Sequence, residues 1–142
     1  MKKAGFSLIE VLVAIILIGI AIAALVAAGS SFTRANAAGA ELATAEFLIE
    51  QIRELTTMLP YGDLDDFVGG ASHTKTFCPP IAADRTVLND FAAFTQKVTV
   101  KNVSASDLQQ VVGYDSNFVR VSVEVSLNSR PISSVSWIRA KY

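Results

Sequence analysis

The sequence has few of the residues that enzymes and metal proteins need. Its 142 residues include one cysteine and one histidine. A single cysteine excludes an intramolecular disulfide framework and a multi-cysteine metal site. A single histidine removes most zinc and catalytic-triad chemistry, and neither a phosphate-binding loop nor a nucleophile elbow is present. We therefore expect a protein that is not an enzyme and binds no cofactor.

An excess of charge of either sign is also missing. The chain has 12 Lys and Arg residues against 13 Asp and Glu residues, a formal net charge of -1. Proteins that bind nucleic acid through bulk charge are clearly basic, so this balance argues against a nucleic-acid partner. Charged residues are only 18% and apolar residues 51% of the chain. These values exclude general disorder and favour one domain with a membrane association.

The apolar residues are concentrated near the N-terminus, in residues 6–28. As a helix, this run would span roughly 35 Å, enough to cross a hydrocarbon core of about 30 Å. Lys2 and Lys3 precede the run, and the first basic residue after it is Arg34. The positive-inside rule then keeps the short basic end cytoplasmic and translocates the rest. The run exceeds the about 7–15 apolar residues of a secretory signal, so we predict a retained transmembrane helix.

Glu10 is the one acidic residue in this apolar run. A carboxylate in a bilayer is costly and usually has a partner and a function. The alternative is that Glu10 lies near the helix end and reaches the headgroups. If the chain were cut after Gly5, Phe6 would carry a positive α-amino group one helical turn before Glu10, on the same helix face. The carboxylate could then offset the charge of that amine, in its own chain or in a neighbour.

The stretch from Lys3 to Ala14, KAGFSLIEVLVA, closely resembles the N-terminus of the type IV pilin superfamily, which includes major pilins, minor pilins and the pseudopilins of type II secretion. The resemblance implies that residues 1–5 are a leader peptide, that prepilin peptidase cuts between Gly5 and Phe6, and that Phe6 is N-methylated. It implies that Glu10 then docks against a neighbour's N-terminal amine during subunit assembly.

The same resemblance implies where the protein lies and what it contacts. It would be a single-pass inner-membrane protein with a periplasmic head, and after assembly part of a pilus (fimbrium) or of a periplasmic pseudopilus. Its partners would be prepilin peptidase, other pilins or pseudopilins in a helical filament, the inner-membrane assembly platform and, before assembly, membrane lipid.

Proline is absent from the apolar run, whereas major pilins and some pseudopilins carry one late in it. A proline there would remove a backbone donor and loosen the helix. Its absence argues against a major pilin and favours a minor pilin or a pseudopilin. A minor pilin is the function we predict. Two alternatives stay open: a pseudopilin of a type II secretion system, acting in protein secretion, and a membrane-anchored periplasmic binding module for adhesion or DNA uptake.

Residues 29–59 are predicted to continue the helix as an amphipathic segment that ends before Pro60. Its apolar stripe at helical spacing comprises Ala38, Leu42, Ala45, Ile49, Ile52, Leu55 and Leu59. Charged residues occupy the other faces. Among them Glu50 and Glu54 have the i,i+4 spacing of some catalytic and metal sites, but we interpret them as part of a solvated face.

Residues 60–142 are predicted to form a globular head that covers the stripe. The segment up to residue 95 is expected to be irregular. Alternating apolar and polar residues predict three strands at residues 96–103, 119–127 and 132–141, with a turn between the last two that makes them antiparallel. A bulge or a two-sided edge is expected in the last strand. The predicted fold class is α+β: a long N-terminal helix packed on a small antiparallel meander, as in pilins.

A few single residues complete the predictions. Cys78 is predicted to be a small buried or half-buried residue, with an intermolecular disulfide as the alternative, and His73 an exposed loop residue. Asp63, Asp65 and Asp66 resemble a loose calcium loop but lack a downstream glutamate at EF-hand spacing. No metal site is therefore predicted.

Overall fold

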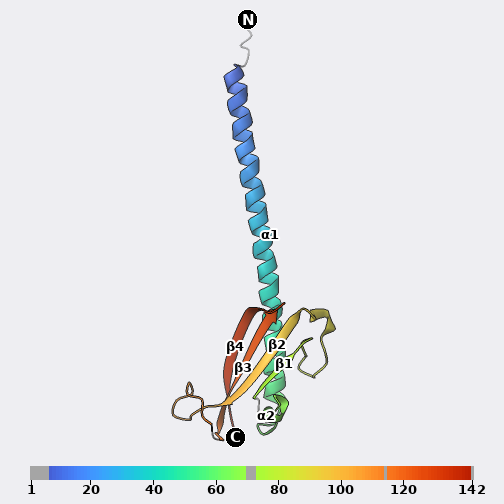
Figure 1. The fold of residues 1–142 in the computed structure, drawn as a ribbon, viewed down its shortest axis with the longest axis vertical. Helices are drawn as coiled ribbons and strands as arrows, with labels where there is room; N and C mark the ends of the chain where they lie inside the picture. The colour runs from blue at the N-terminus through green and yellow to red at the C-terminus, as the bar shows by residue number, and fades with distance from the viewer. Residues whose placement is uncertain (1–6, 70–72, 114, 142) are drawn as a thin grey trace. The chain divides into compact units, whose positions relative to one another are not determined.

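The computed structural model describes residues 7–69, 73–113 and 115–141. Its elements are α1 (Leu8–Met58), α2 (Asp63–Phe67), β1 (Thr74–Phe77), the 3-10 helix η2 (Asn89–Phe91), β2 (Phe94–Asn102), β3 (Phe118–Leu127) and β4 (Arg130–Ala140) (Figure 1). The chain divides into two compact units, Met1–Ala40 and Glu41–Tyr142. We call the second unit the head. The predicted α+β, pilin-like fold class is confirmed.

The first unit consists of the N-terminal part of α1. The Ser7 carbonyl accepts hydrogen bonds from the N–H groups of Glu10 (3.0 Å) and Val11 (3.2 Å), which opens the helix. Every residue from 8 to 40 is exposed. The hydroxyls of Ser30 and Thr33 donate to main-chain carbonyls one turn earlier in the helix. These two hydroxyls are therefore satisfied within the helix.

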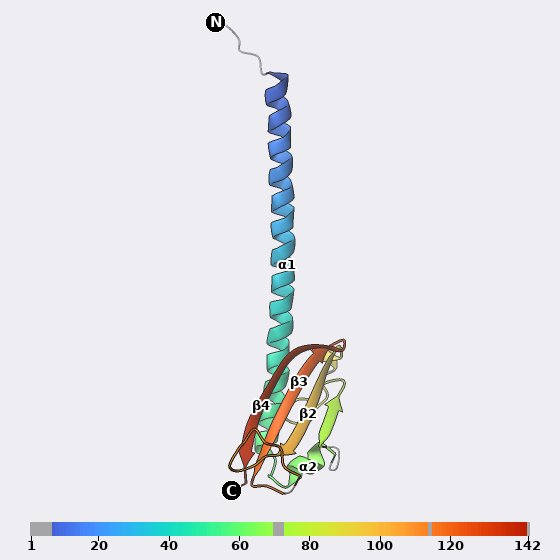
Figure 2. The ribbon, with the colours of Figure 1, turned by 60° about the vertical axis from the view of Figure 1, so that its left-hand side comes forward.

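The head contains one four-stranded antiparallel sheet in the order β1-β2-β3-β4 (Figure 2). The bounds of β2, β3 and β4 lie within two residues of the predicted ranges. Asn128 and Ser129, both with positive φ (49° and 68°), form the tight turn between β3 and β4, as two-residue hairpins require. The sheet is thus a simple meander of neighbours in sequence.

The expectation that the segment up to residue 95 is irregular was wrong. It contains α2, η2 and the strand β1, which pairs with β2 through Thr74↔Thr99 and Phe77↔Gln96. A strand of four residues is too short to show alternation. Its stability comes from the pairing with β2, about twenty residues later in the chain, which a local pattern does not reveal.

The core of the head lies between the C-terminal part of α1 and the inner face of the sheet. The buried helix residues are Ala45, Leu48, Ile49, Ile52, Leu55 and Thr56, and the sheet contributes Val98, Val100, Val119, Val121, Val123 and Val125. The predicted stripe was wrong at its start, because Ala38 and Leu42 are exposed and burial begins at Ala45. Glu50 and Glu54 are exposed, and Glu50 pairs with Arg53 at 2.9 Å.

Among the polar side chains that join α1 to the rest of the head are Gln96 and Arg139. The fully buried Gln96 accepts a hydrogen bond from the Ile81 N–H (2.7 Å) and donates to the Leu48 carbonyl (2.9 Å). Arg139 on β4 donates to the carbonyls of Thr56 and Leu59, at the end of α1. Helix C-termini leave such carbonyls without partners, and a cation there also suits the helix dipole.

The last strand carries the expected irregularity. Its register with β3 shifts after Val125, from Val125↔Ser133 to Ser126↔Pro131, which leaves Ile132 as the extra residue of a bulge. Beyond the bulge, Trp137 lies opposite Val121 on the inner face, where the Arg53 guanidinium sits 5.1 Å from its ring centroid. Trp137 therefore packs on the sheet face.

Candidate functional site

Of the residues predicted to take part in processing and assembly, the structure describes Glu10. Gly5 and Phe6 lie outside the described residues. Glu10 is exposed in the first turn of α1, where the helix dipole favours a negative charge. Within the described part of the chain, its carboxylate has no hydrogen bond or ion pair. Among the described residues, no side chain of the same molecule therefore partners the Glu10 carboxylate.

The surface around Glu10 is apolar on every side of the helix. Leu8 is 86% exposed, Ile16 51% and Leu25 75%. Residues 8–40 contain only two charged side chains, Glu10 and Arg34. α1 includes an 18-residue window with a mean hydropathy of 3.2, so by length and composition it could cross a membrane. A helix that is apolar all round is stable when lipid or protein covers it.

Asp63, Asp65 and Asp66, which resemble a loose calcium loop in the sequence, are part of the short helix α2. Asp65 Oδ1 lies 3.5 Å from His73 Nδ1, whereas Asp63 and Asp66 line a cavity. Across residues 7–69, 73–113 and 115–141, no group of three or more His, Cys, Asp or Glu side chains is placed to hold a metal ion. His73 is half-buried rather than exposed, so the prediction for that residue was wrong.

Cys78 is exposed, which contradicts the prediction of a buried or half-buried residue. It follows Phe77, the last residue of the edge strand β1, and so lies where the sheet ends. The chain contains no second cysteine that could pair with it.

Tyr61, just after α1, links the end of the helix to the loop before β3. Its hydroxyl donates to the Ser116 carbonyl at 2.6 Å. Partial burial raises the pKa of the Tyr61 hydroxyl, and the carboxylates of Asp115 and Asp65 act in the same direction. The hydroxyl thus stays protonated and keeps its role as a donor.

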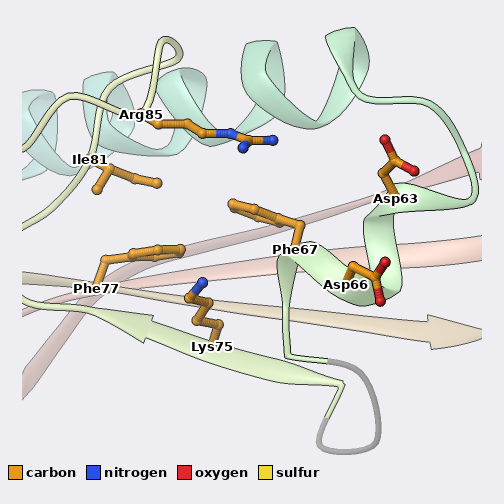
Figure 3. A pocket seen from close by; sticks show the side chains of 7 residues that line it. All are labelled: Asp63, Asp66, Phe67, Lys75, Phe77, Ile81 and Arg85. Carbon is orange, nitrogen blue, oxygen red and sulfur yellow. The ribbon is translucent and has the colours of Figure 1, made fainter.

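The sequence did not indicate a cavity in the head that brings together Phe67, Lys75, Phe77 and Arg85 (Figure 3). These residues belong to α2, β1 and the loop after β1. Lys75 and Phe77 stand two residues apart, on the same face of β1, but this could be recognised only once the strand was known.

Comparison with protein families gives one finding at the N-terminus. Residues 1–26 match the family described as "Prokaryotic N-terminal methylation motif". The matched range contains Gly5, Phe6 and Glu10 and ends within the apolar part of α1. Comparisons with curated proteins and with solved structures give no match.

Proposed function

The chain carries the N-terminal methylation motif of type IV pilins and pseudopilins, and we propose that it is a structural subunit of a type IV pilus-like filament, specifically a minor pilin. Prepilin peptidase cuts it between Gly5 and Phe6 and methylates the new α-amino group of Phe6. The observation that carries the proposal is the motif at residues 1–26, in register with a helix whose apolar side chains are exposed all round.

The apolar part of α1 requires a cover before and after assembly. Complete burial of one Leu, Ile or Val side chain contributes about 1.5–3 kcal/mol, so exposing this surface to water would cost tens of kcal/mol in total. Lipid covers it first, and the helices of neighbouring subunits cover it in the filament. One apolar environment replaces another when the subunit moves from lipid into the filament through the inner-membrane assembly platform. The free energy of burying this apolar surface is therefore nearly unchanged.

The Glu10 carboxylate favours the transfer from lipid into the filament and fixes how neighbouring subunits align. A carboxylate within a bilayer is unfavourable by about 2.5–3.5 kcal/mol on insertion scales. In the filament it pairs with the methylated amine of Phe6 on a neighbouring subunit, so both charges gain a partner. Removal of Lys2 and Lys3 with the leader changes the side-chain charge from 12 − 13 to 10 − 13, which is -3.

The proposal is tested by substituting Glu10 in cells that make the filament. We expect Glu10→Gln to be processed normally but reduced by about tenfold or more in sheared filaments, as the loss of roughly 1.4 kcal/mol of pairing energy requires. Glu50→Gln, an exposed glutamate of the same helix, is the matched control and should assemble like the wild type.

Two results would count against the proposal. Normal assembly of Glu10→Gln would remove the role of Glu10 in pairing. A wild-type chain that is processed but never leaves the membrane fraction would contradict the pilus assignment and favour the pseudopilin.

A further inference from the structure

A cavity of about 570 Å³ lies in the head (Figure 3). Its lining residues are Asp63, Asp66, Phe67, Lys75, Phe77, Ile81 and Arg85. The filament role proposed above uses none of them. Ligand sites of drug-sized molecules typically occupy about 300–1,000 Å³, so the volume suits a small organic group.

Two phenylalanines, Phe67 and Phe77, line the cavity. Phe67 and Phe77 are stacked, with ring centroids 5.6 Å apart and an interplanar angle of 24°. Ile81 is nearly buried beside them. A flat apolar group placed on these rings would gain both hydrophobic burial and favourable ring-ring geometry.

Lys75 is an unusual residue for its position in the sheet. It pairs with Val98, whose face of the sheet carries the valines of the core. The cavity leaves Lys75 exposed, with its Nζ 5.3 Å from the Phe77 centroid and 5.8 Å from the Phe67 centroid. The ammonium group is therefore held over the aromatic pair by cation–π attraction.

Arg85 brings a second cation to the same place. It occupies a tight turn with φ of 69°, in which its N–H donates to the Ala82 carbonyl at 3.0 Å. In Figure 3 its guanidinium and the Lys75 ammonium enter the cavity from opposite sides of the Phe67 ring. Among the residues described, neither cation has a hydrogen bond or an ion pair through its side chain, so both are available to an anion.

The carboxylates of Asp63 and Asp66 lie toward the other end of the cavity, on α2 (Figure 3). They would repel a second negative charge, which disfavours polyanions such as nucleic acid. We propose that the cavity binds an aromatic carboxylate, with the ring on Phe67 and Phe77 and the anionic group between Lys75 and Arg85. Both cations attract the carboxylate electrostatically, and either can donate a charge-assisted hydrogen bond to it. Its source is either a free small molecule or adjacent aromatic and acidic side chains of a protein partner.

Titration of the full chain in detergent micelles tests this proposal, with NMR shifts of the Phe67 and Phe77 amides as the readout and empty micelles as the blank. The probes are N-acetylphenylalanine and its uncharged amide. We expect the carboxylate to saturate with a Kd of about 1 mM or tighter, and the amide to bind about tenfold more weakly. Equal binding of the two probes, or no saturable shift by either, overturns the proposal.

Variants then locate the anion site. Lys75→Gln and Arg85→Gln should each weaken binding of N-acetylphenylalanine by about tenfold, whereas Arg85→Lys should retain part of the affinity. Lys97→Gln changes an exposed lysine on the opposite face of the same sheet and should bind like the wild type. Unchanged affinity in folded Lys75→Gln and Arg85→Gln contradicts the proposal. If one variant fails to fold, the other decides.

A second pair of probes separates the two sources of the ligand. Acetyl-Phe-Glu-amide presents a ring and a carboxylate as a peptide does, and acetyl-Phe-Gln-amide lacks the charge. Tighter binding of the Glu peptide than of N-acetylphenylalanine supports a protein partner, and the reverse order supports a free small molecule. Both results require the charge, so equal binding of the Glu and Gln peptides counts against the carboxylate site.

Discussion

The two parts of α1 belong to one helix but meet different surroundings. In residues 8–40 every residue is exposed, although most are apolar. In residues 41–58 six residues are buried against the sheet, and charged side chains occupy the outer faces. The amphipathic part obtains its cover from its own head, whereas the largely apolar part would obtain it from lipid or from other chains. The distribution of polar residues thus separates the segment that packs within the head from the segment that we propose to take part in assembly.

The largest expected difference between the two parts of α1 comes from replacing one isoleucine in each part by alanine. Ile52 is fully buried, and Ile52→Ala should lower the free energy of unfolding of the head by about 2–5 kcal/mol, through lost burial and the cavity left behind. Ile16→Ala, the matched control, should leave it unchanged. Thermal unfolding of the full chain in detergent, followed by Trp137 fluorescence, measures both. Equal destabilisation would show that the two parts are not independent.

The next largest effect concerns the attachment of α1 to the sheet through Gln96. Gln96→Leu leaves the Ile81 N–H without its acceptor in a buried site, so we expect a loss of about 1–3 kcal/mol. Gln51→Leu is the control, because Gln51 makes a single, half-buried hydrogen bond to the Ala83 N–H at 3.1 Å. Its loss should be smaller, and chemical denaturation measures both. The reverse order would refute the central role of Gln96.

A smaller effect is expected at the C-terminal end of α1. Arg139→Met removes the donor to the Thr56 and Leu59 carbonyls and should cost about 1–2 kcal/mol. Amide hydrogen exchange in the last turn of α1 should accelerate in parallel. Arg120→Met removes an exposed hydrogen bond from β3 to the Leu108 carbonyl in the preceding loop and should leave that exchange unchanged. Acceleration by both variants would mean that Arg139 acts through general stability alone.

The smallest effect concerns the turn that presents Arg85. Hydrogen bonds from the Thr86 hydroxyl and N–H hold the pKa of Asp84 below its ordinary value of 3.8. Because the folded pKa is depressed, this contribution to stability is present above that ordinary value and is lost as the pH falls through the folded pKa. Thr86→Val should raise the pKa of Asp84, as the Thr86 amide shift measured between about pH 2 and pH 6 would reveal. An unchanged pKa would exclude the hydroxyl as the cause.

Features with a long, regular pattern could be predicted from the sequence. The apolar run and the helical spacing that follows it predict α1, and the strict alternation of valines from Val119 to Val125 predicts β3. The N-terminal motif was also visible, because Gly5, Phe6 and Glu10 stand in fixed register with the apolar run. Each of these patterns lies within a short stretch of chain.

Features that depend on distant pairing could not be predicted. β1 has four residues, and one inner position is occupied by Lys75, so its pattern resembles a loop. Burial of the helix begins at Ala45 rather than Ala38 because the residues that cover it come from β2 and β3. The cavity was missed for the same reason, since α2, β1 and the Arg85 turn converge only in the folded head. Cys78 was placed by the general tendency of cysteine to be buried, which its position at the end of an edge strand overrides.

The intact mass of the chain, measured separately in the membrane and sheared-filament fractions, is the most direct test of the proposed processing and assembly. We expect the mass of residues 6–142 plus one methyl group in both fractions. That result would place the processed helix first in lipid and then in the filament. A chain that begins at Met1 or Lys2 and carries no methyl group in either fraction would contradict the account and leave an anchored domain in its place.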